Sequence, residues 1–210
     1  MARAPTPAPC GATPRARVKS LRILAAACAL ASAAGATFAA DLFAERRALC
    51  LDCHGKDGLS RNPEVPSLGG VPEFYALLQL VEFRDGERTS VIMNTMVKGM
   101  SDDDLRAAAA FVGAQPRPAA PTSPGDPERM ARGRELAKQH RCGFCHGPEF
   151  LGGEQMPPLR HQREDYLLKA LRDYKQQKRI GLRAAMAEVL QPVDDASLVD
   201  LAHYLAHVSP

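Results

Sequence analysis

Two copies of one five-residue pattern carry the residues best suited to redox chemistry. In each copy two cysteines are separated by two residues, and a histidine follows the second cysteine at once. The copies are Cys50, Cys53 and His54, and Cys142, Cys145 and His146. In this pattern both thiols form thioethers with a haem, and the histidine is placed to ligate its iron. On a helix the two cysteines share one face, and the histidine lies about one turn beyond the first. We therefore predict two covalently bound haem c groups.

Two other uses of paired cysteines fit the sequence less well. A thioredoxin-like redox pair needs a βαβ pattern, which the chain does not show. A structural zinc site gathers four ligands around one metal, whereas each pair here has its own histidine. Cys10 and Cys28 lie in the N-terminal segment discussed below, so the remainder of the chain has no spare cysteine.

The rest of the chain follows the same duplication. Cys53 and Cys145 lie 92 residues apart, and other matches keep nearly that offset. The further pairs are Gly55 with Gly147, Pro66 with Pro157, Leu68 with Leu159, Tyr75 with Tyr166, Arg88 with Arg179, Met93 with Met186, Leu105 with Leu198 and Phe111 with Tyr204. We predict two related domains, residues 41–113 and 128–210. Residues 114–127 hold five prolines, which favour an extended, semi-rigid linker.

Methionine and histidine are the usual candidates for the sixth iron ligand. The available methionines are Met93, Met96 and Met100 in the first domain, and Met130, Met156 and Met186 in the second. Only Met93 and Met186 match across both copies, since Met96 and Met100 align with Val189 and Val193, which have no ligand atom. We predict Met93 and Met186 as iron ligands, and Met96 and Met100 as core residues.

The remaining histidines have weaker claims to a functional role. His203 and His207 lie on the expected last helix and His140 just before the second haem motif, so we expect satisfied core or surface side chains. His161 follows a Pro-Pro-Leu loop expected near the second haem, and a distal role for it stays open.

Both domains show helical periodicity, and we predict an all-α fold. Short helices, residues 41–50 and 128–142, lead into the haem motifs. Pro72 opens a second helix, repeated at residues 165–178. Acidic capping signals, Ser101 to Asp104 and Asp194 with Asp195, precede the last helix of each domain. Domains this small bury little apolar surface, so the porphyrin would supply a large part of each core.

The first 40 residues resemble a targeting segment. They hold five basic residues, no acidic one, and an apolar run of small residues from Ile23 to Ala36. This layout predicts a signal peptide at residues 1–40, cut after Ala36, Ala39 or Ala40, and hence export to the periplasm. The apolar run is short for a transmembrane anchor. A lipoprotein cut before Cys28 is a further alternative, though Ala25 to Ala27 fit it poorly.

Removal of this segment reverses the sign of the net charge. The whole chain has a formal net charge of +3, but without residues 1–40 the value is −2, so nucleic-acid binding loses its compositional support. The two domains differ in sign: residues 41–113 carry −4 and residues 128–210 carry +2. Many of the cations lie between Arg160 and Arg183, which suggests either a solvated helix face or a docking surface for an acidic partner.

These features together resemble class I cytochrome c. The resemblance rests on C-x-x-C-H-G, the P-x-L loop, the Tyr-led helix ending in F-R-D-G-E-R-T, and I-M-x-x-M-x-x-G-M-S-D-D-D-L before an aromatic-bearing last helix. Two such modules in tandem are similar to the dihaem cytochrome c4 family. The second copy departs from the pattern where Arg160 and His161 replace Gly69 and Gly70, and where Gln177 replaces Gly86. Gly133 has no counterpart, and its small size favours close packing of the first and last helices.

The resemblance implies His/Met ligation and one-electron transfer between respiratory redox partners in the periplasm. It also implies that Pro66 and Pro157 shape the loops against the two histidines. We expect an electron carrier rather than an enzyme. Its partners would be a respiratory complex, a terminal oxidase or a dehydrogenase subunit, and any membrane association would be peripheral. The alternative is the electron-accepting subunit of a periplasmic dehydrogenase such as flavocytochrome c sulfide dehydrogenase. A haem enzyme is a less favoured third alternative, because it needs one iron with an open or unusual sixth position and both modules offer a methionine.

Overall fold

A computed structural model describes residues 41–179 and 184–209. The predicted signal peptide and Arg183 lie outside the described residues. Within them the chain is helical, and a single bridge between Gly153 and Met156 is its only β-type pairing. No helix among them has the length and apolar character needed to cross a membrane.

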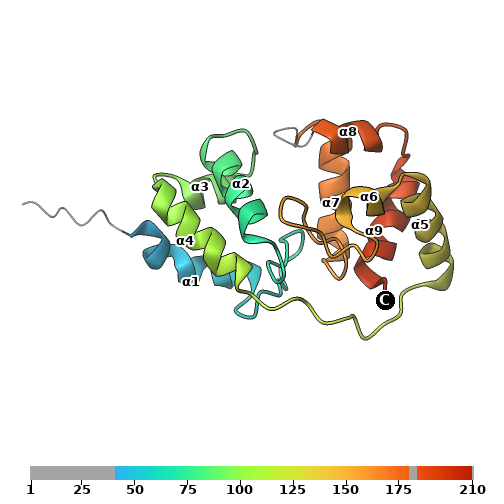
Figure 1. Ribbon diagram of the computed structural model, residues 1–210, viewed down its shortest axis with the longest axis horizontal. Helices are drawn as coiled ribbons and strands as arrows, with labels where there is room; N and C mark the ends of the chain where they lie inside the picture. Colours follow the sequence, from blue (N-terminus) through green and yellow to red (C-terminus); the bar gives the residue numbers. More distant parts are fainter. Residues whose placement is uncertain (1–40, 180–183, 210) are drawn as a thin grey trace, which may run out of the picture. The chain divides into compact units, whose positions relative to one another are not determined.

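Helices α1–α4 form the first module and α5–α9 the second (Figure 1). In the first module they are α1 (Leu42–His54), α2 (Glu73–Arg84), α3 (Val91–Val97) and α4 (Asp102–Gly113). In the second they are α5 (Pro127–Gln139), α6 (Cys142–His146), α7 (Glu164–Lys175), α8 (Ala184–Leu190) and α9 (Asp195–His207). The all-α prediction is thus confirmed.

The predicted capping signals start the last helix of each module. The Ser101 hydroxyl accepts from the Asp104 backbone N–H at 3.1 Å, and the Asp104 carboxylate accepts in return from the Ser101 N–H at 2.9 Å, which completes a capping box. Asp194 caps α9 by accepting from the Ser197 N–H at 2.7 Å. These caps fix where α4 and α9 begin, and therefore which of their faces meet the core.

The prediction for the helix before the second haem motif was wrong in one respect. The helix expected to run from 128 into Cys142 ends at Gln139, and the motif forms a separate helix, α6. Arg141 causes the break because it adopts a left-handed backbone with φ of 54°, which a right-handed helix does not accommodate. In the first module α1 runs unbroken through Cys53 to His54.

Two loop positions keep a left-handed backbone in both modules although their residues differ. Gly70 and Gly86 have φ of +73° and +81°, and their counterparts His161 and Gln177 hold +61° and +56°. A side chain in this region costs roughly 1–2 kcal/mol per residue. His161 is held there by two hydrogen bonds, from its N–H to the Leu205 carbonyl at 3.2 Å and between Nε2 and the Val208 carbonyl at 3.0 Å.

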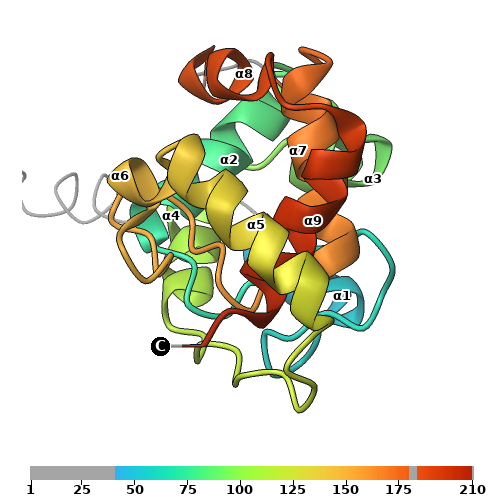
Figure 2. The same ribbon diagram turned by 90° about the vertical axis from the view of Figure 1, so that its right-hand side faces the viewer.

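The close helix packing expected from Gly133 is present at the crossing of α5 and α9 (Figure 2). A Cβ on Gly133 would lie 2.4 Å from the Asp200 carbonyl oxygen and 2.4 Å from the Tyr204 Cβ. Both are far inside van der Waals contact. The crossing positions α9, whose Leu198 and Leu201 are almost fully buried in the second core.

Replacing Gly133 by alanine is therefore expected to destabilise the second module. Overpacking of this kind costs roughly 1–3 kcal/mol, which exceeds the gain of about 1 kcal/mol in helix propensity. Guanidinium unfolding followed by circular dichroism measures the difference. Gly153→Ala is the matched control, since a Cβ there meets nothing within 4 Å. Equal stability of the two variants would contradict the close crossing.

Candidate haem sites

The first haem motif is held by one continuous helix. Asp41 caps α1 by accepting from the Ala44 N–H at 2.9 Å, and the helix places Cys50 and Cys53 one turn apart before it ends at His54. His54 is buried. Burial lowers the pKa of its imidazole, and so it favours the neutral ring that can ligate a metal.

A backbone carbonyl orients each motif histidine. Nδ1 of His54 lies 2.8 Å from the Pro66 carbonyl oxygen, and Nδ1 of His146 lies 3.0 Å from the Pro157 carbonyl oxygen. In a neutral ring Nδ1–H then donates to the carbonyl, and the lone pair resides on Nε2, the atom that would face an iron. The two prolines are repeat partners, and this contact agrees with the role that the resemblance implied for them.

The four thiols are available for covalent attachment. None of them forms a disulfide, and Cys145 is exposed. Burial raises the pKa of the Cys50 and Cys142 thiols, so both stay protonated near neutral pH. Two thiols and a histidine whose Nδ1 contacts a proline carbonyl occur in each module, and this donor set fits a covalently bound haem c.

The methionines predicted from the repeat occupy equivalent positions in the fold. Met93 is the third residue of α3, and Met186 is the third residue of α8, and both helices are seven residues long. Each methionine is partly buried against the core of its own module. Met100 is buried in the core, as expected, and its counterpart Val193 is buried too.

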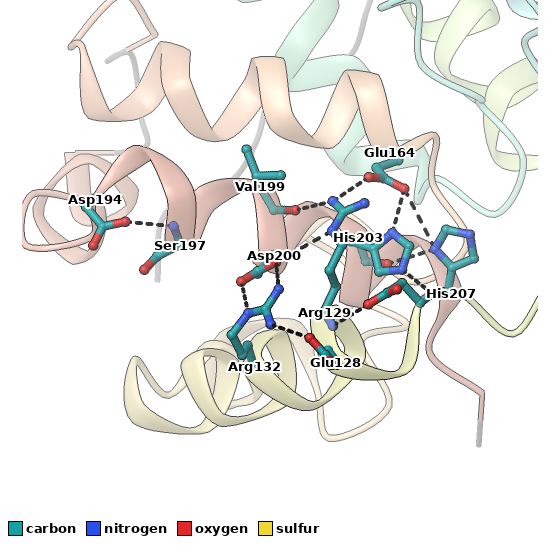
Figure 3. A network of polar contacts seen from close by, with 11 residues as sticks. Glu128, Arg129, Arg132, Glu164, Asp194, Ser197, Val199, Asp200, His203 and His207 are labelled. Atoms are coloured by element: carbon teal, nitrogen blue, oxygen red, sulfur yellow. Dashed lines mark hydrogen bonds and ion pairs between the residues drawn. The ribbon is translucent and has the colours of Figure 1, made fainter.

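His203 belongs to a separate polar network that joins α5, α7 and α9 (Figure 3). Its Nδ1 lies 2.9 Å from Glu164 Oε2, and its Nε2 accepts from the Asp126 N–H at 2.8 Å. Arg129 also donates to Glu164, at 2.8 Å. Burial alone would raise the pKa of Glu164, but the hydrogen bonds from His203 and Arg129 lower it. This agrees with the expectation of a satisfied core histidine.

Glu164, His203 and His207 are also close enough to form a three-ligand metal cluster. The hydrogen bonds argue against that use. A metal on Nδ1 of His203 would leave the proton on Nε2, where it would face the Asp126 N–H. Nδ1 of His207 is in turn 2.9 Å from the His203 carbonyl oxygen, which it can only approach as a donor. The network ties the end of the linker to α7 and α9.

The repeat partners Arg88 and Arg179 exchange contacts between the modules. Arg179 donates to the Tyr75 hydroxyl at 2.8 Å and to Gln79 Oε1 at 2.6 Å. Arg88 donates to the Tyr166 hydroxyl at 3.3 Å and to the same oxygen of Gln79 at 2.6 Å. Each arginine therefore reaches the tyrosine of the other module. The sequence paired these residues by offset but gave no sign of the exchange.

This arrangement places two cations close together in a buried setting. Arg179 is only 6% exposed, and buried Glu82 joins the cluster through the Gln79 amide, which donates to it at 2.7 Å. Burial opposes ionisation of Tyr166, but Arg179 and Arg88 outweigh it and lower the pKa of that hydroxyl to about 8. The exchanged contacts are thus charge-assisted, which makes them stronger than neutral hydrogen bonds.

Comparison with known proteins decides the family. The cytochrome c family model matches residues 130–209. A cytochrome c4 from Pseudomonas aeruginosa is 30% identical over 168 residues, 76% of this chain and 84% of that protein. The chain belongs to the cytochrome c4 family. It therefore carries two covalently bound haem c groups and transfers electrons.

Other relatives agree with this assignment. A thiosulfate dehydrogenase electron acceptor from Stutzerimonas stutzeri is 31% identical over 169 residues, 76% of this chain and 78% of that protein. The crystal structure of reduced recombinant cytochrome c4 from Pseudomonas stutzeri superposes with a TM-score of 0.71 at 26% identity, over 80% of this chain and 97% of that one. The similarity thus extends over both modules of the cytochrome c4 fold.

Proposed function

We propose that the chain is an exported dihaem carrier that moves single electrons between periplasmic redox partners. The observation that carries this proposal is the duplicated donor set. Each module joins a C-x-x-C-H motif, a histidine oriented by a proline carbonyl, and a methionine at the third position of a short helix. In this assignment His54 and Met93 ligate one iron, and His146 and Met186 ligate the other.

The roles of the polypeptide follow from this ligand set. Haem iron supplies the one-electron chemistry when bound. Cys50, Cys53, Cys142 and Cys145 fix the group covalently, and the proline carbonyls hold each histidine in one tautomer. A methionine sulfur raises the reduction potential relative to a second histidine. If His54 and Met93 hold one iron and His146 and Met186 hold the other, the chain leaves no place for a substrate at either iron, and we infer that it has no substrate chemistry of its own.

A second role is favoured by the similarity to a thiosulfate dehydrogenase electron acceptor. In that role the chain accepts electrons from a separate dehydrogenase subunit, as in the sulfide dehydrogenase alternative above. Purification of the tagged protein from periplasm distinguishes the two roles. A stoichiometric partner enzyme would indicate a subunit, and recovery of the protein alone would indicate a free carrier.

The haem count tests the proposed donor set directly. We expect two haems per chain in a pyridine haemochrome assay, both retained in denaturant because thioethers are covalent. Cys53→Ser/His54→Ala should leave one haem, and Cys145→Ser/His146→Ala should leave the other. Haem that acid acetone extracts from the wild-type protein, or a count of one, would contradict the proposal.

A further inference from the structure

We propose that an acidic redox protein docks on the face formed by α5 and α6 of the second module, named here the α5–α6 face. Its exposed residues are Arg134, Lys138, Arg141 and Phe144. This inference rests on the proposed electron-carrier function and adds to it the place and the chemistry of partner binding.

The α5–α6 face surrounds a hollow that is open to solvent. Its volume is about 380 Å³, and the three cations and Phe144 stand around apolar residues, among them Phe150 and Tyr204. Phe144 is 81% exposed, an unusual exposure for so large an apolar side chain. The Arg141 guanidinium lies 5.4 Å from the centre of its ring. An aromatic anchor beside an arginine is the composition of an interface hot spot.

The cations of this face have no acidic partners within the described part of the chain. Arg134 and Lys138 are four residues apart on α5, so their like charges share one helix face at a small cost in stability. Arg141 adds a third positive charge at the same hollow. Carboxylates from a partner would relieve this repulsion, which specifies an acidic surface as the occupant.

Several other cations of the second module are already paired. Arg172 bonds Asp195 at 2.6 Å, Arg163 bonds Asp165 at 2.7 Å, and Lys169 pairs with Asp173. Lys175 donates to the Gln191 carbonyl at 2.8 Å. In the stretch from Arg160 to Arg183, which the sequence suggested as a docking surface, Arg163, Lys169 and Arg172 are thus neutralised by carboxylates. Lys178 is exposed and has no acidic partner among the described residues, and Arg183 lies outside them. On the α5–α6 face, by contrast, three cations without acidic partners lie around one hollow.

The first module lacks an equivalent face. At an offset of 92 residues the positions hold Leu42, Arg46, Leu49 and Asp52. Arg46 is the single cation among them, and it donates to the backbone carbonyls of Met96 and Lys98. Asp52 replaces Phe144 and would repel an acidic partner. The docking face therefore belongs to the second module alone among the described residues.

The position of Phe144 links docking to electron transfer. It lies inside the second haem motif, directly before the exposed Cys145. A protein seated on Phe144 therefore contacts the segment that carries the haem. Contact with the haem-bearing segment serves electron exchange with a redox partner, which favours a protein over a membrane as the occupant.

Reduced cytochrome b5, a small acidic haem protein, serves as the probe in stopped-flow measurements on the holoprotein. We expect Arg141→Glu to lower the second-order rate roughly tenfold at low ionic strength, and the loss to vanish as salt screens the charges. Lys178→Glu changes the net charge equally at an exposed site outside this face and should have a much smaller effect. Phe144→Ser should lower the rate at all salt concentrations, while Phe74→Ser, the matched aromatic control, should not.

Three outcomes would overturn the docking proposal. The first is an unchanged rate in Arg141→Glu, and the second is an equal loss of rate in Lys178→Glu. The third is binding to phosphatidylglycerol vesicles that Phe144→Ser abolishes, while the same variant leaves the rate with cytochrome b5 unchanged. Reduction by a small uncharged flavin separates this result from failure of the proposed function. If all variants react normally with the flavin, both haems are intact and only docking is tested; if the wild type fails there, the electron-carrier proposal itself is wrong.

Discussion

Met93→Ala is expected to remove about half of the weak red absorption band that a methionine sulfur gives with ferric haem, and to lower one of the two reduction potentials. The cause is the loss of the sulfur ligand, which favours the reduced iron relative to nitrogen or water. Met186→Ala should remove the other half of the band and lower the other potential. Optical titration of the purified holoprotein measures both quantities in one experiment.

Met96→Ala is the control for this prediction, because Met96 is a partly buried residue of the same helix, α3. It should leave the band and both potentials unchanged. If Met93→Ala keeps the full band, Met96 or Met100 is the ligand and the equivalence of α3 with α8 has no functional meaning. If Met186→Ala keeps it, Met130 or Met156 must be considered in the second module.

Arg179→Gln is expected to destabilise the contact between the modules. It removes a donor that Tyr75 and Gln79 share, and hydrogen bonds to charged groups contribute about 1.5–3 kcal/mol each. Chemical unfolding of the holoprotein measures the loss. Arg172→Gln, which removes an exposed ion pair with Asp195, should cost much less, because solvent screens that pair.

Two further readouts separate the exchanged contact from general destabilisation. Tyr75→Phe and Arg179→Gln should be non-additive in a double-mutant cycle, because both remove the same hydrogen bond. In Arg179→Gln the pKa of Tyr166 should rise above its value of about 8, since Arg179 contributes most to lowering it. Ultraviolet titration of tyrosinate detects this rise. Additive losses together with an unchanged Tyr166 pKa would show that the exchanged contact is absent.

Local features of the helices, such as their caps, were predicted well from the sequence. The caps at Ser101 and Asp194 were predicted because capping involves residues only three positions apart. The role of Gly133 was anticipated because small size matters wherever two helices cross closely. The break at Arg141 was missed, since periodicity alone does not reveal one residue with a left-handed backbone.

The candidate site likewise has features that the sequence predicts and features that only the tertiary structure decides. The haem motifs and the pairing of Met93 with Met186 follow from the sequence, because attachment chemistry resides in five consecutive residues and duplication leaves a constant offset. Which cations remain unpaired was decided only by the tertiary structure. Arg172 pairs with Asp195, which lies 23 positions away in the sequence, and Arg179 donates to Tyr75, which lies 104 positions away. Charge neutralisation and buried hydrogen bonds depend on distances in space, and those distances are set by how the helices pack.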